Sequence, residues 1–184
     1  MPIKTIAIIG AGQTGRAIAF LSALAGYRTI LEAVSPELLD HATRYIEAAL
    51  QEGIQKGTVT AQQKTQTFEN LSTSRSVEDV CRVADFLIDA TQEELEVKLE
   101  IFTLFDKFAK PDAILASTSQ TIPLADLAGI TFRQENCIGL RFRAPIVETK
   151  LLEIVRTGET SEETIQASVD FARRLGKEVS VTME

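Results

Sequence analysis

Residues 4–15, with the sequence KTIAIIGAGQTG, join an apolar, β-branched run to a glycine-rich turn. The run at residues 4–9 predicts a buried strand, and the apolar spacing of residues 13–25 predicts a helix that ends at Gly26. The turn between them has the pattern GxGxxG, formed by Gly10, Ala11, Gly12, Gln13, Thr14 and Gly15. Such a turn between a strand and a helix lets backbone N–H groups approach a pyrophosphate. The stretch therefore predicts a strand, turn and helix that can hold a nucleotide.

Glu32 follows the second predicted strand, residues 28–31, about 20 residues after the glycine turn. In a βαβ unit, an acid at this point accepts hydrogen bonds from the adenosine ribose, and its charge repels a 2′-phosphate. The turn and the acid together favour NAD over NADP as the cofactor. The alternative is an ordinary tight turn followed by a solvated acid.

Short β-branched runs alternate with longer helical patterns along the rest of the chain, which is typical of βαβ units and a parallel sheet. Further strands are expected at residues 73–76, 86–89, 113–117, 137–142, 151–155 and 178–181. Further helices are expected at residues 36–51, near Thr60, after Ser76, and at residues 93–108 and 161–175. The first two of these helices should form a hairpin that projects from the sheet. The predicted fold class is α/β, a Rossmann-type doubly wound, mostly parallel sheet with flanking helices, in a single domain over residues 1–184.

Composition narrows the classes of ligand. The chain has 184 residues, 45% of them hydrophobic, and a formal net charge of −7. Nucleic-acid binding needs a basic face and none stands out, so a small-molecule ligand is expected. No apolar run approaches the roughly 20 residues of a membrane span, and no metal-ligand spacing is present. Cys81 and Cys137 are expected to be buried structural thiols in a reducing compartment, which favours a cytoplasmic protein.

Four longer stretches carry a family likeness. They are GAGQTGRAIA at residues 10–19, LIDATQEELEVKLEIF at 87–102, LASTSQTIPLADLA at 115–128 and IGLRFRAPIVETKLLEIV at 138–155. In the same order they resemble GAGxMGxGIA, VIEAVxExLxxKxxLF, ASNTSSLxIxxIA and IGLHFFNPVPxMKLVEIV of the NAD-binding domain of L-3-hydroxyacyl-CoA dehydrogenases. The resemblance covers nearly the whole chain. It implies an NAD-dependent oxidoreductase of fatty acid metabolism with an acyl-CoA substrate.

The resemblance also implies cofactor contacts at further positions. Glu93 and Lys98 stand where the family approaches the cofactor beyond the fourth strand, and an ion pair on the helix surface is the alternative. Gln120 stands where a serine of the family meets both cofactor and substrate. Ala144 replaces an asparagine of the same pocket.

The family's catalytic base is a histidine oriented by a glutamate, and those positions are here Arg141 and Glu153. A guanidinium keeps its proton at working pH and cannot act as a general base, so a salt bridge between Arg141 and Glu153 is expected. With Gln120 and Ala144, three of the family's four catalytic positions differ. His41, the only histidine, is expected on the surface of the helix after the second strand, where it cannot replace the base. The family's own reaction is therefore expected to be impaired.

Two functions stay open. The first is an oxidoreductase of altered activity on an acyl-CoA or a small anion, in which Arg141 anchors the substrate. Arg141 and Arg143 together could clamp a carboxylate or phosphate because alternate residues of a strand share a face, and ordinary ion pairs are the alternative. The second is a non-catalytic NAD-binding regulatory or interaction module.

The chain is also shorter than the family. There, a helical domain follows the strand near Val181 and forms the dimer, whereas this sequence ends at Glu184. The sequence leaves open whether the chain is naturally short or a fragment, and whether a homo-oligomer forms through another surface.

Overall fold

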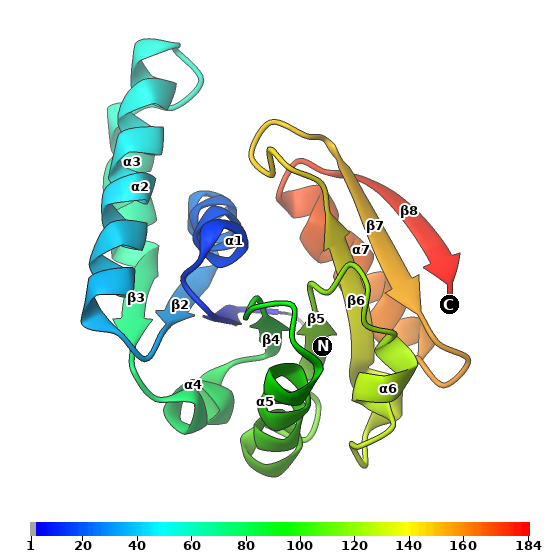
Figure 1. Ribbon diagram of the computed structural model, residues 1–184. Helices are drawn as coiled ribbons and strands as arrows, with labels where there is room; N and C mark the ends of the chain where they lie inside the picture. Colours follow the sequence, from blue (N-terminus) through cyan, green and yellow to red (C-terminus); the bar gives the residue numbers. More distant parts are fainter. Residues whose placement is uncertain (1–2) are drawn as a thin grey trace.

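The computed structural model describes residues 3–184 and places their eight strands in one sheet, in the order β3-β2-β1-β4-β5-β6-β7-β8 (Figure 1). The strands are β1 (Thr5–Ile9), β2 (Arg28–Glu32), β3 (Leu71–Ser74), β4 (Phe86–Asp89), β5 (Ile114–Ser117), β6 (Cys137–Phe142), β7 (Leu151–Arg156) and β8 (Glu178–Met183). Neighbouring strands run parallel except for β6 and β7, which are antiparallel. The predicted α/β class with a mostly parallel sheet is confirmed.

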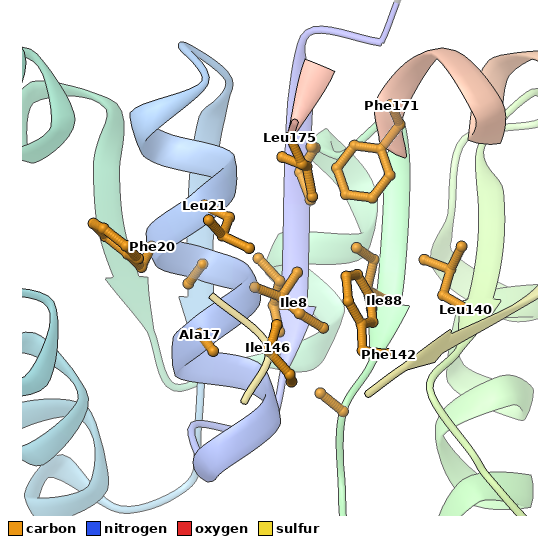
Figure 2. Packing of buried hydrophobic residues seen from close by; sticks show 14 of the residues in the cluster. Ile8, Ala17, Phe20, Leu21, Ile88, Leu140, Phe142, Ile146, Phe171 and Leu175 are labelled. Carbon is orange, nitrogen blue, oxygen red and sulfur yellow. The ribbon is translucent and has the colours of Figure 1, made fainter. Parts of the chain in front are cut away.

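Helices cover both faces of the sheet, with an apolar core under each set. One face carries α1 (Gln13–Leu24), α2 (Pro36–Gln55), α3 (Ala61–Asn70) and α7 (Glu162–Arg174), and the other carries α4 (Val77–Val83), α5 (Leu95–Phe108) and α6 (Leu124–Ala128). Figure 2 shows the first core, where Phe171 of α7 and Leu21 of α1 pack near Ile8 and Ile88 in the centre of the sheet. Burial of both sheet faces explains why the strands read as continuous apolar runs.

Side-chain caps start both helices of the α2–α3 pair. The Ser35 side chain accepts a hydrogen bond from the Leu38 N–H at the start of α2. Thr60 and Gln63 form a reciprocal capping box at the start of α3. The two helices form the predicted hairpin, which projects beyond the sheet in Figure 1.

Sequence periodicity does not indicate two short elements that the structure contains. They are α6 (Leu124–Ala128) and the 3-10 helix η1 (Gln134–Asn136). Elements this short do not complete two helical turns, so they leave no repeating apolar pattern. Periodicity also ends α2 near residue 51, whereas the helix continues to Gln55.

The two cysteines are free and fully buried, as the sequence predicts. Burial raises the pKa of Cys81 to about 12 and that of Cys137 to about 11. Both thiols therefore stay protonated at neutral pH and act as packing groups.

None of the helices within residues 3–184 combines the length and the apolar character that a membrane crossing requires. The same residues contain no group of His, Cys, Asp and Glu side chains arranged to hold a metal ion.

Candidate functional site

A cavity of about 1190 Å³ opens at the carboxyl ends of the central strands. Its walls are the glycine turn, Glu32 at the end of β2, and the segments that follow β4, β5 and β6. β1 lies between β2 and β4, which makes it the point where the strand order reverses. Ligands of doubly wound sheets bind in the crevice at such a point.

The three glycines of the turn have different roles in shaping this cavity. Gly10 has a φ of +101°, and a Cβ added there would lie 2.7 Å from the Ala90 carbonyl oxygen. A Cβ on Gly15 would lie only 1.7 Å from the Gly10 carbonyl oxygen, so this glycine lets α1 pack closely on the end of β1. A Cβ on Gly12 would meet nothing within 4 Å. Gly12 therefore leaves the backbone at the start of α1 open to a ligand in the cavity.

Glu32 supplies an acidic group to the same cavity. Its side chain is only 2% exposed, and the buried Oε1 atom has no hydrogen-bond partner. Burial raises the pKa of this carboxyl to about 7. A buried acceptor that faces a cavity and lacks a donor suits a ligand with hydroxyl groups. The glycine turn and this orphaned oxygen therefore fit a dinucleotide, with the adenosine ribose at Glu32.

We expect Glu32 to make the ligand-free protein less stable as pH rises from about 4.5 to 7. The folded chain binds the Glu32 proton more tightly than the unfolded chain, because the pKa is raised from 4.5 to about 7 on folding. The contribution of this group to stability is thus greatest at low pH and is lost as the carboxyl ionises, by roughly 3 kcal/mol in total.

Denaturant unfolding of the wild-type protein and of Glu32→Gln at pH 5 and pH 8 measures this effect. Glu32→Gln should have a higher free energy of unfolding than wild type at pH 8. The difference between the two proteins should be smaller at pH 5. Equal shifts at both pH values would show that the pKa of Glu32 is not raised in the folded chain.

Glu93 orders the loop that follows β5. Its Oε1 atom accepts hydrogen bonds from the Ser119 hydroxyl, from the Gln120 N–H at 3.1 Å and from the N–H and hydroxyl of Thr121, each at 3.0 Å. Burial alone would raise the pKa of Glu93, but the hydrogen bonds from Ser119 and Thr121 outweigh it and lower the pKa. Glu93 thereby fixes Gln120 at the wall of the cavity.

Lys98 lies behind the cavity wall, away from its lining. The side chain is completely buried, and its Nζ atom lies 2.9 Å from Asp89 Oδ2 and 3.2 Å from the Thr91 carbonyl oxygen. The alternative of a surface ion pair between Lys98 and Glu93 is wrong, because Asp89 at the end of β4 is the partner. Lys98 instead holds the turn after β4, which includes the cavity residues Ala90 and Thr91.

The expected salt bridge between Arg141 and Glu153 is also wrong. These residues are register partners across β6 and β7, but Arg141 Nη2 lies 3.3 Å from Glu184 Oε1. Glu153 Oε1 accepts a hydrogen bond from the Thr182 hydroxyl at 2.9 Å. β8 lies beside β7 and brings both competing partners to this end of the sheet. Arg141 lines a second, much smaller cavity together with Glu184.

Arg141 and Arg143 do not form the clamp that their spacing indicates. β6 ends at Phe142, so Arg143 lies beyond the regular strand and no longer follows its alternation. Arg143 and Ala144 line the large cavity together with Gln120, whereas Arg141 does not.

Lys177 is a buried residue that sequence reasoning missed. Its ammonium donates hydrogen bonds to the carbonyl oxygens of Ile146 and Thr149, and burial lowers its pKa. These bonds anchor the segment of residues 143–149, which forms one wall of the cavity. Figure 2 shows Ile146 of this segment beside Ala17 of α1. An exposed lysine gives the same sequence pattern, so no signal could have identified this one.

The predicted site residues that share the large cavity are Gly10, Ala11, Gly12, Gln13, Thr14, Glu32, Glu93, Gln120 and Ala144. Gly15, the last residue of the turn, does not line the cavity, and neither do Lys98, Arg141 and Glu153. Sequence reasoning missed Arg16 and Tyr45, which line the cavity and contact each other. The position of Arg16 next to Gly15 was the available signal.

Comparisons with known proteins agree with this geometry. Residues 5–184 match the family model described as "3-hydroxyacyl-CoA dehydrogenase, NAD binding domain". The chain belongs to this family. The resemblance found in the sequence is thus confirmed at the level of the 3-hydroxyacyl-CoA dehydrogenase NAD-binding domain.

Several relatives of this NAD-binding domain are similar along nearly all of the chain. The 3-hydroxybutyryl-CoA dehydrogenase of Bradyrhizobium diazoefficiens is 35% identical over 180 residues, which cover 98% of this chain and 61% of that protein. The mitochondrial hydroxyacyl-coenzyme A dehydrogenase of Sus scrofa is 33% identical over 181 residues, 95% of this chain and 57% of that protein. The crystal structure of (S)-3-hydroxybutyryl-CoA dehydrogenase from Ralstonia eutropha superposes with a TM-score of 0.95 at 27% identity, covering 100% of this chain and 64% of that one. The chain therefore spans about three fifths of the length of these relatives.

Proposed function

We propose that this NAD-binding domain holds NAD(H) in the large cavity, prefers it to NADP(H), and has little of the family's 3-hydroxyacyl-CoA dehydrogenase activity. The observation that carries the first part is the unpartnered, buried Oε1 atom of Glu32 beside the open glycine turn. Ribose hydroxyls would satisfy this oxygen, and a 2′-phosphate in their place would bring like charges together.

Different groups of the protein would bind different parts of the cofactor. The backbone N–H groups at the start of α1 face the place where the diphosphate would bind, with Gly12 leaving room for it. Glu32 is placed to bind the ribose, and Glu93 holds the loop that presents Gln120. Bound NAD would accept a hydride from a carbon that carries a hydroxyl group.

Oxidation of such a carbon also requires a group that removes the hydroxyl proton. The family resemblance assigns this role to the position of Arg141, which is paired with Glu184. A guanidinium group is too weak a base to serve as a general base. Loss of a general base typically lowers a rate by about 10²–10⁴. We therefore propose that hydride transfer by the family's mechanism is strongly impaired in this chain.

Arg143 supports a second candidate function. It lines the large cavity beside Gln120 and Ala144, and within residues 3–184 no acid lies within ion-pair distance of it. A free guanidinium there suits a substrate that carries a carboxylate or phosphate. The second candidate is thus an oxidoreductase that acts on a small anion. NADH consumption with a keto acid, lost in Arg143→Met, would favour it.

Calorimetric titration with NADH and NADPH at pH 8, where the Glu32 carboxyl is ionised, tests the cofactor proposal. Wild-type protein should bind NADH at least about tenfold more tightly than NADPH, since one charge repulsion or lost charge-assisted hydrogen bond is worth roughly 1.5–3 kcal/mol. Glu32→Gln should reduce this preference because it removes the negative charge. Failure of folded wild-type protein to bind NADH would overturn the proposal.

Steady-state oxidation of 3-hydroxybutyryl-CoA tests the catalytic part. The wild-type protein should show almost no turnover, and the triple variant Arg141→His, Gln120→Ser, Ala144→Asn should gain on the order of 10²-fold or more. A histidine at position 141 would lie across the strand pair from Glu153, its orienting acid in the family. A matched control carries Arg143→His instead of Arg141→His and should show no gain. Rapid turnover by the wild-type protein would contradict the proposal.

A further inference from the structure

Arg16 has an unusual environment for an arginine at the wall of a cavity. It lies in the first turn of α1, directly after Gly15, and its guanidinium lies 4.4 Å from the centre of the Tyr45 ring on α2. The Nε atom is buried and has no hydrogen-bond partner. Arg16 and Tyr45 both line the large cavity. The guanidinium is therefore held against the Tyr45 ring while its Nε–H group lacks an acceptor.

Within residues 3–184, the Arg16 guanidinium has no acidic partner, and Glu32, which lines the same cavity, is equally unpartnered. A buried donor without a partner is costly, and native proteins rarely keep one without a reason. Helical side chains lean toward the N-terminus of their helix, so Arg16 adds positive charge to the end of α1 that already favours anions.

The two unpartnered groups can bind different parts of one ligand. Glu32 lacks hydrogen-bond donors, which ribose hydroxyls provide, and Arg16 lacks an acceptor, which a phosphate oxygen provides. The glycine turn directly precedes Arg16 in the sequence, and its residues 10–14 line the same cavity as Arg16 and Glu32. A nucleotide with a ribose and a diphosphate satisfies both.

We infer that Arg16, braced on the ring of Tyr45, is a recognition residue for the diphosphate of a nucleotide bound in the large cavity. The inference rests on the proposed function, because it concerns the same cavity. Both a dinucleotide such as NADH and a coenzyme A thioester contain a diphosphate that Arg16 could bind. Tyr45 holds the guanidinium through a cation–π contact and limits its freedom before the ligand arrives.

Titration with ADP-ribose and adenosine tests the inference directly. Arg16→Met keeps the length and packing of the side chain but removes its charge, and it should weaken ADP-ribose binding roughly ten- to hundredfold. Adenosine has no phosphate, so its affinity should change little. Arg44→Met is the matched control, because Arg44 is an exposed arginine beside Tyr45 on α2 and does not line the cavity. This control should bind ADP-ribose like the wild type.

Further variants separate charge and packing from loss of fold. Arg16→Lys should retain part of the ADP-ribose affinity, Tyr45→Phe should retain most of it, and Tyr45→Leu should lose several-fold. The dependence of binding on salt should be smaller in Arg16→Met than in wild type, because one charge interaction is absent. Circular dichroism of each variant confirms that it is folded.

The source of the diphosphate follows from a parallel titration with acetoacetyl-CoA. A loss for ADP-ribose alone assigns Arg16 to the dinucleotide, and a loss for acetoacetyl-CoA alone assigns it to the coenzyme A thioester. Equal affinities of wild type and Arg16→Met for both ligands would overturn the inference while leaving the proposed NAD site intact. Absence of any nucleotide binding by the wild type would instead overturn both.

Discussion

Lys98→Met is expected to lower the free energy of unfolding by roughly 3–5 kcal/mol, because it leaves the carboxylate of Asp89 buried without its cation. Neither side chain of this pair is exposed, and Nζ lies 2.9 Å from Oδ2. Methionine fills a similar volume, so the effect reports the lost charge rather than a cavity. Urea denaturation followed by circular dichroism measures it.

Two further variants test whether the stability lost in Lys98→Met comes from the stranded charge of Asp89. Lys56→Met removes an exposed lysine that pairs with Glu52, and it should leave stability nearly unchanged. Asp89→Asn added to Lys98→Met removes the stranded charge and should recover a large part of the loss. Equal stability of Lys98→Met and wild type would mean that water reaches Asp89 in the folded protein.

Gly15→Ala is expected to reduce NADH affinity at least about a hundredfold and to destabilise the chain by roughly 1–3 kcal/mol or more. The new methyl group would lie 1.7 Å from the Gly10 carbonyl oxygen, so α1 and the turn must move apart. That movement would displace the backbone N–H groups that we propose bind the diphosphate. Calorimetric titration and urea denaturation of the same preparation measure the two effects.

Gly12→Ala should separate binding from stability. Its methyl group meets no protein atom within 4 Å, so unfolding should change by less than about 1 kcal/mol. The same methyl group would occupy the space where a diphosphate approaches the turn, so NADH affinity should fall at least about tenfold. Gly158→Ala, also in open space but away from the cavity, is the control and should change neither quantity. Unaltered NADH binding by Gly12→Ala would place the ligand elsewhere.

The sequence by itself determined the order of the main elements and the glycine-rich turn that joins β1 to α1. β-branched runs of four to six residues and amphipathic stretches of ten or more follow from local sequence, because backbone periodicity fixes which side chains share a face. Two requirements of the glycine pattern are equally local, namely the positive φ of Gly10 and the close approach of Gly15 to the Gly10 carbonyl oxygen. The position of Glu32 at the end of β2 could be predicted as well, because one βαβ unit sets its distance along the chain from the turn.

Only the tertiary structure decided which charged groups meet. Register across β6 and β7 suggests a pair between Arg141 and Glu153. Thr182 of β8 and Glu184 directly after β8 are the partners instead. Lys98 of α5 likewise pairs with Asp89 at the end of β4, although Glu93 is closer to Lys98 in the sequence. A long charged side chain can pair with any opposite charge that packing brings within a few ångströms. Which charges come that close depends on contacts between residues distant in sequence. The unpartnered atoms of Arg16 and Glu32 could also be identified only from the tertiary structure, because the absence of a partner depends on every group packed around them.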